Sequence, residues 1–112
     1  MRLLGVSYTG GVCWDYSYTT LKNSKRIAGY LSPNTGFVTF AGKTRLSMPV
    51  MTFAHEVGHS VGAQHDGTEN ECNPRKYMMA SHTSTLPEDH QKTFSQCSKD
   101  YFTAELQRVV EV

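Results

Sequence analysis

The stretch HEVGHSVGAQHD, residues 55–66, contains three of the five histidines of the chain and decides its interpretation. His55 and His59 are one helical turn apart, so on a helix both imidazoles leave the same face, with Cβ atoms about 6 Å apart. Two ligands at that separation can reach one metal ion. Glu56 projects beside them, where it could take a proton from a water molecule held at the same site.

His65 cannot reach the same ion from a straight helix. The six residues after His59 turn a helix through about 600°, which leaves His65 roughly 120° away from the ligand face and ~9 Å along the axis. The chain must therefore turn back, and Gly62 permits this because glycine adopts positive φ at little cost. Three neutral imidazoles leave the fourth position of a tetrahedral zinc ion to water, which is typical of a catalytic site rather than a structural one.

The alternative to an enzyme is a former metal site that survives as a surface for binding peptides or proteins. Glu56 argues against that alternative, because a protein that only binds needs no general base beside the ligands. His82 and His90 stand in polar segments without partner spacing, so we interpret them as solvent-exposed side chains rather than ligands.

Length and charge limit the remaining possibilities. A chain of 112 residues with a formal net charge of +1 can form one small domain with a modest core. It has neither a basic run nor aromatic residues between basic ones, which argues against nucleic acid or an anionic membrane as a partner. No apolar run approaches the roughly 20 residues of a membrane span, and the start MRLLGVSYTGG is too quickly polar for a secretory signal.

The residue pattern predicts an α/β fold with two strands. Leu3 to Tyr8 and Gly36 to Phe40 are β-prone runs, and residues 13–33 between them are polar and interpreted as a loop. Apolar residues at spacings of three and four predict a helix from Pro49 to about Val61, ended by Gly62. Residues 64–93 are rich in turn-forming residues, which predicts a long irregular segment that needs a cross-link or a ligand to hold it. A terminal helix is expected from about Ser98.

The string H-E-x-x-H-x-x-G-x-x-H-D resembles the metzincin zinc endopeptidases, and Asp66 points to their adamalysin or reprolysin branch, the ADAM and snake-venom type. Met79 in KYMMAS, fourteen residues after His65, matches the family's Met-turn better than Met78 does. LLGVSYTGGVC, NTGFVTF and FSQCS resemble the edge strand, the strand before the active-site helix and the start of the last helix. TFAHEVGH and FSQCSK are most similar to the Kuzbanian and tumour-necrosis-factor-converting sheddases, with secreted invertebrate reprolysins as other plausible relatives.

The resemblance implies that residues 1–112 are the C-terminal part of a metzincin catalytic domain that hydrolyses internal peptide bonds of protein or peptide substrates. One Zn²⁺ ion would be held by the three histidines of residues 55–66, with Glu56 as general base, Asp66 in a structural role and Met79 beneath the site. The substrate would lie antiparallel along the first strand. The implied substrate-binding residues are Leu4, Gly5, Val6, Ala80, Ser81 and His82.

The three cysteines are an odd number without a C-x-x-C pair, so two could bridge and leave one over. Cys72 and Cys97 bracket the irregular segment, and we predict a disulfide between them. Such a bond implies an extracellular or secretory location. By the resemblance, the partner of Cys13 would follow the terminal helix, so we expect Cys13 to be unpaired here. We expect the chain to be a fragment of a longer secreted or membrane-anchored protein with other domains, and a poor enzyme alone.

Overall fold

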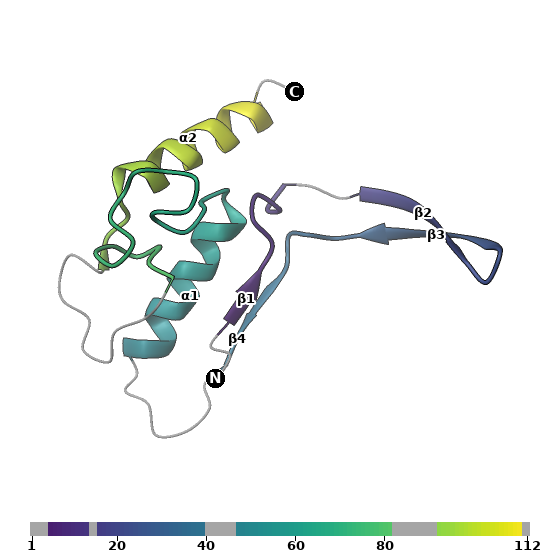
Figure 1. The fold of residues 1–112 in the computed structure, drawn as a ribbon, viewed down its shortest axis with the longest axis horizontal. Helices are drawn as coiled ribbons and strands as arrows, with labels where there is room; N and C mark the ends of the chain where they lie inside the picture. Colours follow the sequence, from purple (N-terminus) through teal and green to yellow (C-terminus); the bar gives the residue numbers. More distant parts are fainter. Residues whose placement is uncertain (1–4, 14–15, 40–46, 82–91, 111–112) are drawn as a thin grey trace.

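The computed structural model describes residues 5–13, 16–39, 47–81 and 92–110 (Figure 1). These residues form, in chain order, strands β1 (Gly5–Ser7), β2 (Tyr16–Lys22), β3 (Lys25–Leu31) and β4 (Gly36–Val38) and helices α1 (Ser47–Ser60) and α2 (Gln96–Val110). The predicted α/β class and both predicted helices are confirmed. The prediction of only two strands is wrong, because the chain forms four, in two separate two-stranded sheets.

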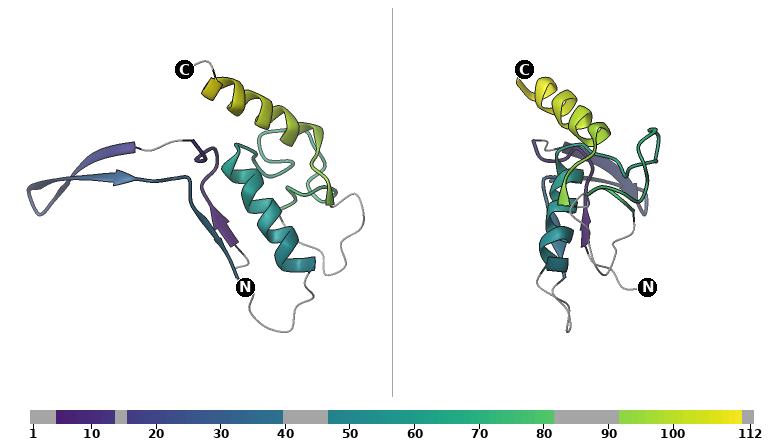
Figure 2. Two further views of the ribbon diagram at one scale, coloured as in Figure 1. Left: turned by 180° about the vertical axis from the view of Figure 1, so that it is seen from behind. Right: turned by 90° about the vertical axis from the view of Figure 1, so that its left-hand side faces the viewer.

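The first sheet lies along helix α1. Strands β1 and β4 pair antiparallel, with Val6 opposite Phe37, and they correspond to the two predicted strands (Figures 1 and 2). The sheet and the helix approach closely at Gly5, where an added Cβ would lie 2.9 Å from Glu56 Cγ. A glycine at this strand position therefore lets β1 lie directly against the side of α1 that carries Glu56.

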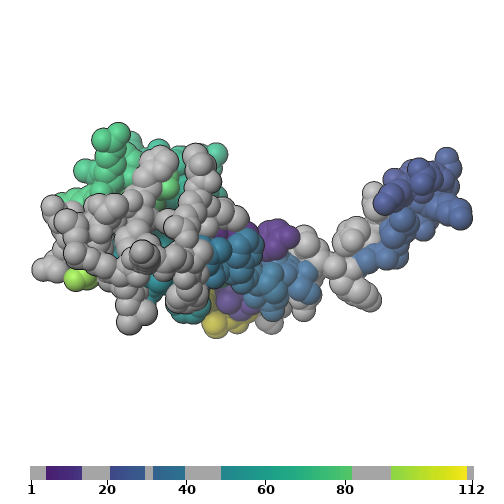
Figure 3. Space-filling view, turned by 90° about the horizontal axis from the view of Figure 1, so that it is seen from below, coloured from purple at the N-terminus to yellow at the C-terminus, as the bar shows by residue number. Residues whose placement is uncertain are grey.

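The second sheet is a hairpin that corrects the prediction of a loop over residues 13–33. Strands β2 and β3 pair from Tyr16 opposite Leu31 to Lys22 opposite Lys25. The two residues between the strands, Asn23 and Ser24, have φ of 50° and 62°, as a type I′ turn requires. The hairpin extends away from the rest of the molecule (Figure 3).

The hairpin was hard to predict because the part of it nearest the turn is exposed to solvent. Residues 21–28 are all exposed, so the alternation of apolar and polar residues that marks a half-buried strand does not arise. The available signals were the Tyr- and Thr-rich run before Asn23 and the turn-forming character of Asn23 and Ser24. An Asn-Gly pair would have been a stronger signal for this turn.

Helix α1 begins two residues before Pro49, which lies in its first turn, and it ends at Ser60. The apolar face predicted for this helix is largely exposed: Val50, Phe53 and Val57 are 57%, 61% and 43% accessible. The buried residues Ala63, Met79 and Ala80 belong instead to the segment after the helix. The core of the described residues therefore lies between α1, this segment and α2.

Helix α2 begins at Gln96, two residues earlier than predicted. The hydroxyl of Ser95 accepts a hydrogen bond from the backbone N–H of Ser98 at 3.2 Å, which is the geometry of an N-cap. Residues 61–81 contain no helix or strand and pass between the two helices (Figure 2). This agrees with the irregular segment predicted for residues 64–93, of which residues 82–91 lie outside the described residues. Among the described helices none is long and apolar enough to cross a membrane.

Candidate metal centre

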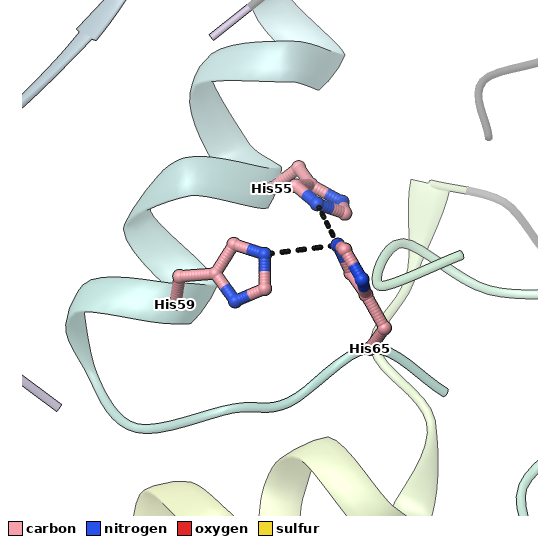
Figure 4. Close-up of side chains that lie close together, drawn as sticks. All are labelled: His55, His59 and His65. Carbon is pink, nitrogen blue, oxygen red and sulfur yellow. Dashed lines mark hydrogen bonds between the residues drawn. The ribbon is translucent and has the colours of Figure 1, made fainter. Parts of the chain in front are cut away.

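Three imidazoles meet at one point beside α1. His55 and His59 extend from the helix, and His65 reaches them from the segment that follows it (Figure 4). The Nε2 atom of His65 lies 3.2 Å from Nε2 of His55 and 3.1 Å from Nε2 of His59. The structure therefore brings together the three residues that the sequence selects as ligands.

Backbone carbonyls orient the two helical histidines. Nδ1 of His55 donates to the carbonyl oxygen of Met78, and Nδ1 of His59 donates to that of Ala63, both at 2.8 Å. A carbonyl oxygen can only accept, so each Nδ1 carries the hydrogen. In the neutral rings the Nε2 atoms then present lone pairs to the centre of the cluster, the arrangement usual for histidines that bind a metal through Nε2.

The cluster fits a metal ion better than it fits hydrogen bonds alone. Nε2 of His65 carries at most one hydrogen, yet it faces the lone pairs of both His55 and His59. One of these lone pairs consequently finds no hydrogen inside the cluster. A cation at the centre would satisfy all three nitrogens, and three imidazoles are a donor set that suits zinc.

Burial favours the form of His55 that binds metal. Desolvation lowers the pKa of His55 below its usual value of 6.5, and the nearby ring of His59 lowers it further. The carbonyl of Met78 and the charges of Glu56 and Asp66 act in the opposite direction but do not reverse the shift. The imidazole of His55 is therefore neutral at neutral pH.

A glycine-centred cap on α1 returns the chain toward the ligands. The N–H of Gly62 donates to the carbonyl of His59, and the N–H of Ala63 donates to that of Gly58, which together form a Schellman motif. Gly62 has φ of +111°, a backbone conformation that is unfavourable for every residue except glycine. This cap directs the following residues back along the helix, as the sequence predicts, and so allows His65 to join the cluster.

Asp66 connects the ligand segment with α2. Its side chain is 2% exposed, and its Oδ1 accepts a hydrogen bond of 2.6 Å from the hydroxyl of Ser95, the N-cap of that helix. Its backbone N–H donates to the carbonyl of Met79. Oδ2 of Asp66 is buried without a hydrogen-bond partner among the described residues. A negative charge near a helix N-terminus is favourable, and these contacts support a structural role.

Met79 packs against the helical turn that carries His55 and His59. Its side chain is completely buried, and it packs against Gly58, which lies between the two histidines of α1. Met78 contributes its backbone oxygen to His55. The two neighbouring methionines thus make different contacts, and the role of Met79 beneath a metal ion stays a prediction.

Glu56 lies on the side of α1 that faces β1. The hydroxyl of Ser7 is 2.7 Å from Oε2 of Glu56 and 2.9 Å from its backbone oxygen, and can donate its hydrogen to either. The carboxylate also borders a pocket of about 340 Å³ between the helix and the sheet, whose walls include Phe37 and Phe53. Ser7 was not predicted as a site residue, because its contact with Glu56 joins residues 49 positions apart.

The predicted substrate-binding residues are only partly within the described chain. Gly5 and Val6 lie on β1, with Val6 exposed, and the edge of β1 away from β4 carries no other described strand. Ala80 is buried and Ser81 is exposed. Leu4 and His82, the remaining two, lie outside the described residues. The role of all six in binding substrate stays a prediction.

The cysteines pair as the sequence predicts. Cys72 and Cys97 form a disulfide with Cα atoms 6.2 Å apart, which ties the irregular segment to the first turn of α2. Cys13 is free and exposed. The disulfide supplies the cross-link that a long segment without helix or strand requires.

Comparison with known proteins agrees with this site. Residues 1–95 match the reprolysin profile of metallopeptidase family M12. A disintegrin and metalloproteinase with thrombospondin motifs 12 from Mus musculus is 47% identical over 60 residues, which are 51% of this chain and 4% of the relative. The thrombospondin-motif protein 7 from the same species is 32% identical over 112 residues, 94% of this chain and 5% of the relative.

A venom protein is similar to a shorter part of the chain. The snake venom metalloproteinase fibrolase of Macrovipera lebetinus is 38% identical over 55 residues, which are 49% of this chain and 26% of the relative. The chain thus matches only a small part of each of these three proteins. Because the profile match covers most of the chain and the three histidines converge, the chain belongs to metallopeptidase family M12, in the adamalysin or reprolysin branch of the metzincins.

Proposed function

We propose that this chain carries the zinc site of an endopeptidase that hydrolyses internal peptide bonds of protein substrates. The convergence of the three Nε2 atoms of His55, His59 and His65 is the observation on which the proposal depends. Membership of a metallopeptidase family supports it independently. A metal-free binding module would have no use for three imidazole nitrogens that meet at one point.

The three histidines would hold one Zn²⁺ ion through Nε2. Zinc at such a site acts as a Lewis acid, which lowers the pKa of water and polarises the carbonyl of the scissile bond. The hydrogen bonds from Nδ1 to the carbonyls of Met78 and Ala63 would keep two of the rings in the tautomer and orientation needed for ligation.

Glu56 would act as the general base. Its carboxylate would accept the proton of the attacking water as the water oxygen bonds to the scissile carbonyl carbon, and would then give that proton to the nitrogen that leaves when the C–N bond breaks. The position of Glu56 next to His55 in the chain supports this role. The hydroxyl of Ser7, when it donates to Oε2, would hold the carboxylate in place beside β1.

The substrate would bind as an extended peptide along β1. An exposed strand edge offers backbone N–H and C=O groups that recognise a peptide independently of its sequence, while pockets supply side-chain preference. Gly5 and Val6 would form part of that edge, with Leu4 before them, and Ala80, Ser81 and His82 would border a side-chain pocket. The close approach of β1 to Glu56 supports this placement, because a peptide on β1 would pass near the base.

We infer further that the chain acts outside the cytosol as part of a longer protein. The Cys72–Cys97 disulfide favours an oxidising compartment. The relatives are many times longer than the matched region. Their names describe metalloproteinases that carry a disintegrin and thrombospondin motifs. Further domains and a secreted or membrane-anchored parent are therefore part of the proposal.

Metal content and peptide cleavage test the proposal together. We expect the intact protein to contain about one zinc ion per chain by inductively coupled plasma mass spectrometry and to cleave members of a quenched fluorescent peptide pool. Phenanthroline should abolish cleavage, and added zinc should restore it. A protein that holds zinc but cleaves no peptide would favour the alternative of a silent binding module, and one that holds no zinc would overturn the metal site itself.

A further inference from the structure

Asn70 uses both ends of its amide in the loop that follows the third histidine. Its Oδ1 accepts hydrogen bonds from the backbone N–H of Gly67 at 2.8 Å and of Cys72 at 3.1 Å. Its Nδ2 donates to the carbonyl oxygens of His65 and Thr68, both at 3.0 Å, and more weakly to the hydroxyl oxygen of Tyr101 at 3.5 Å. The orientation of the amide is unambiguous, because N–H groups can only donate and carbonyls can only accept.

The hydrogen bonds of Asn70 reach His65, the one candidate metal ligand that does not lie on a helix. His55 and His59 belong to α1, whose backbone hydrogen bonds fix the positions of their Cα and Cβ atoms. His65 lies in an irregular segment, and its carbonyl is held by the side chain of Asn70 and by the N–H of Thr68. The loop that contains Asn70 is in turn tied to α2 by the disulfide of Cys72.

We propose that Asn70 is a positioning residue that holds the backbone of His65 where its imidazole completes the metal site. The inference rests on the proposed zinc site and extends it to a residue that does not touch the metal. Residues that orient metal ligands commonly change metal affinity by about 10- to 100-fold when replaced. In Asn70, the acceptor end closes the loop and the donor end holds His65, so the two effects can be separated.

Asn70→Asp removes the donor end of the side chain and keeps the acceptor end, so it tests the hydrogen bond to His65 apart from the closure of the loop. The carboxylate keeps both acceptor interactions, with the N–H groups of Gly67 and Cys72, and has nearly the same size. It loses the donors and instead places an oxygen against the carbonyls of His65 and Thr68, which repel it. The loop should therefore close while the backbone of His65 is pushed from its position.

Asn73→Asp is the matched control. Asn73 is exposed in the same loop, and its Oδ1 accepts the N–H of Arg75 at 3.0 Å, so an aspartate there keeps that interaction. The change introduces the same charge three residues away from Asn70. An effect of charge alone would therefore appear equally in both variants.

The variants are compared in the intact protein with zinc and with Co²⁺ as probes. We expect Asn70→Asp to bind zinc about 10- to 100-fold more weakly in competition with a chelator and to change the visible absorption of the Co²⁺ form, with Asn73→Asp within about twofold of the parent. Peptide mapping without reduction should find the Cys72–Cys97 disulfide in both. If Asn70→Asp does not fold, it is replaced by Asn70→Ser. The serine hydroxyl is too short to span the loop, so this variant also lacks the hydrogen bond to the carbonyl of His65.

Each outcome decides a stated point. Zinc affinity and a Co²⁺ spectrum like those of the parent, in Asn70→Asp or in the substitute Asn70→Ser, overturn the positioning role while leaving the zinc site intact. Equal losses in Asn70→Asp and Asn73→Asp also overturn it, because charge would then explain both. A parent protein that binds no zinc overturns the proposed function, and the inference about Asn70 with it.

Discussion

Gly58 and Met79 pack so closely that a Cβ built on Gly58 would lie 2.6 Å from the Sδ atom of Met79. Gly58 stands between the two histidines of α1, and the side chain of Met79 is completely buried. The ring of Phe94 would lie 3.0 Å from the same Cβ. The helix therefore packs on the methionine at the level of its two histidines, and only glycine at position 58 allows this contact.

Gly58→Ala should destabilise the protein despite the better helix propensity of alanine. Propensity alone favours alanine by about 1 kcal/mol within a helix, but forcing a methyl group into a packed core costs roughly 1–3 kcal/mol. We expect a net loss of about 1 kcal/mol in the free energy of unfolding, measured by urea denaturation. In a Met79→Ala background the same change should be neutral or stabilising; a stabilising effect in the parent would contradict the contact.

Gly62→Ala should weaken both the fold and the metal site. A non-glycine residue at φ of +111° is strained by about 1–2 kcal/mol, and relaxing that strain would alter the cap that returns the chain toward His65. Gly62→Asn should lose less stability, because asparagine tolerates positive φ better than alanine does. Thermal unfolding and zinc affinity are the measurements. Equal stability of the alanine variant and the parent would show that the turn does not depend on glycine.

Glu56→Gln should remove most of the peptidase activity without removing the metal. Glutamine is close to glutamate in size and cannot accept a proton, and the loss of a general base typically reduces the rate by about 10²–10⁴-fold. Zinc content should be unchanged, since three histidines would hold the ion. Ser7→Ala is the companion variant, with a smaller loss expected because the carboxylate remains. Activity of Glu56→Gln within a few-fold of the parent would exclude Glu56 as the base.

Replacing both Cys72 and Cys97 by alanine should lower the free energy of unfolding by about 3.5 kcal/mol, the value that chain entropy predicts for closing a loop with a sequence separation of 25. Zinc affinity should fall as well, because the segment that carries His65 and Met79 loses its tie to α2. Cys13→Ala is the control, since that cysteine is free and exposed. A change in stability as large in the control as in the double variant would contradict the assigned role of the disulfide.

Local patterns in the sequence were enough to predict α1, α2 and the ligand set. The spacing of His55 and His59 depends on a single helical turn, and the need for a reversal before His65 follows from helix geometry. The irregular segment and its cross-link were predictable because turn-forming residues lie between two cysteines. The β2–β3 hairpin was not predicted, because its exposed residues 21–28 need no alternation of apolar and polar residues.

The sequence by itself determined which residues can bind a metal, since ligand chemistry and helical spacing are local properties of residues 55–66. Tertiary structure alone decided what surrounds them: Ser7 beside Glu56, Ser95 bonded to Asp66 and the carbonyl of Met78 on His55. These pairs are separated by 49, 29 and 23 residues. Packing between distant segments brings them together, and no short pattern in the chain records that packing.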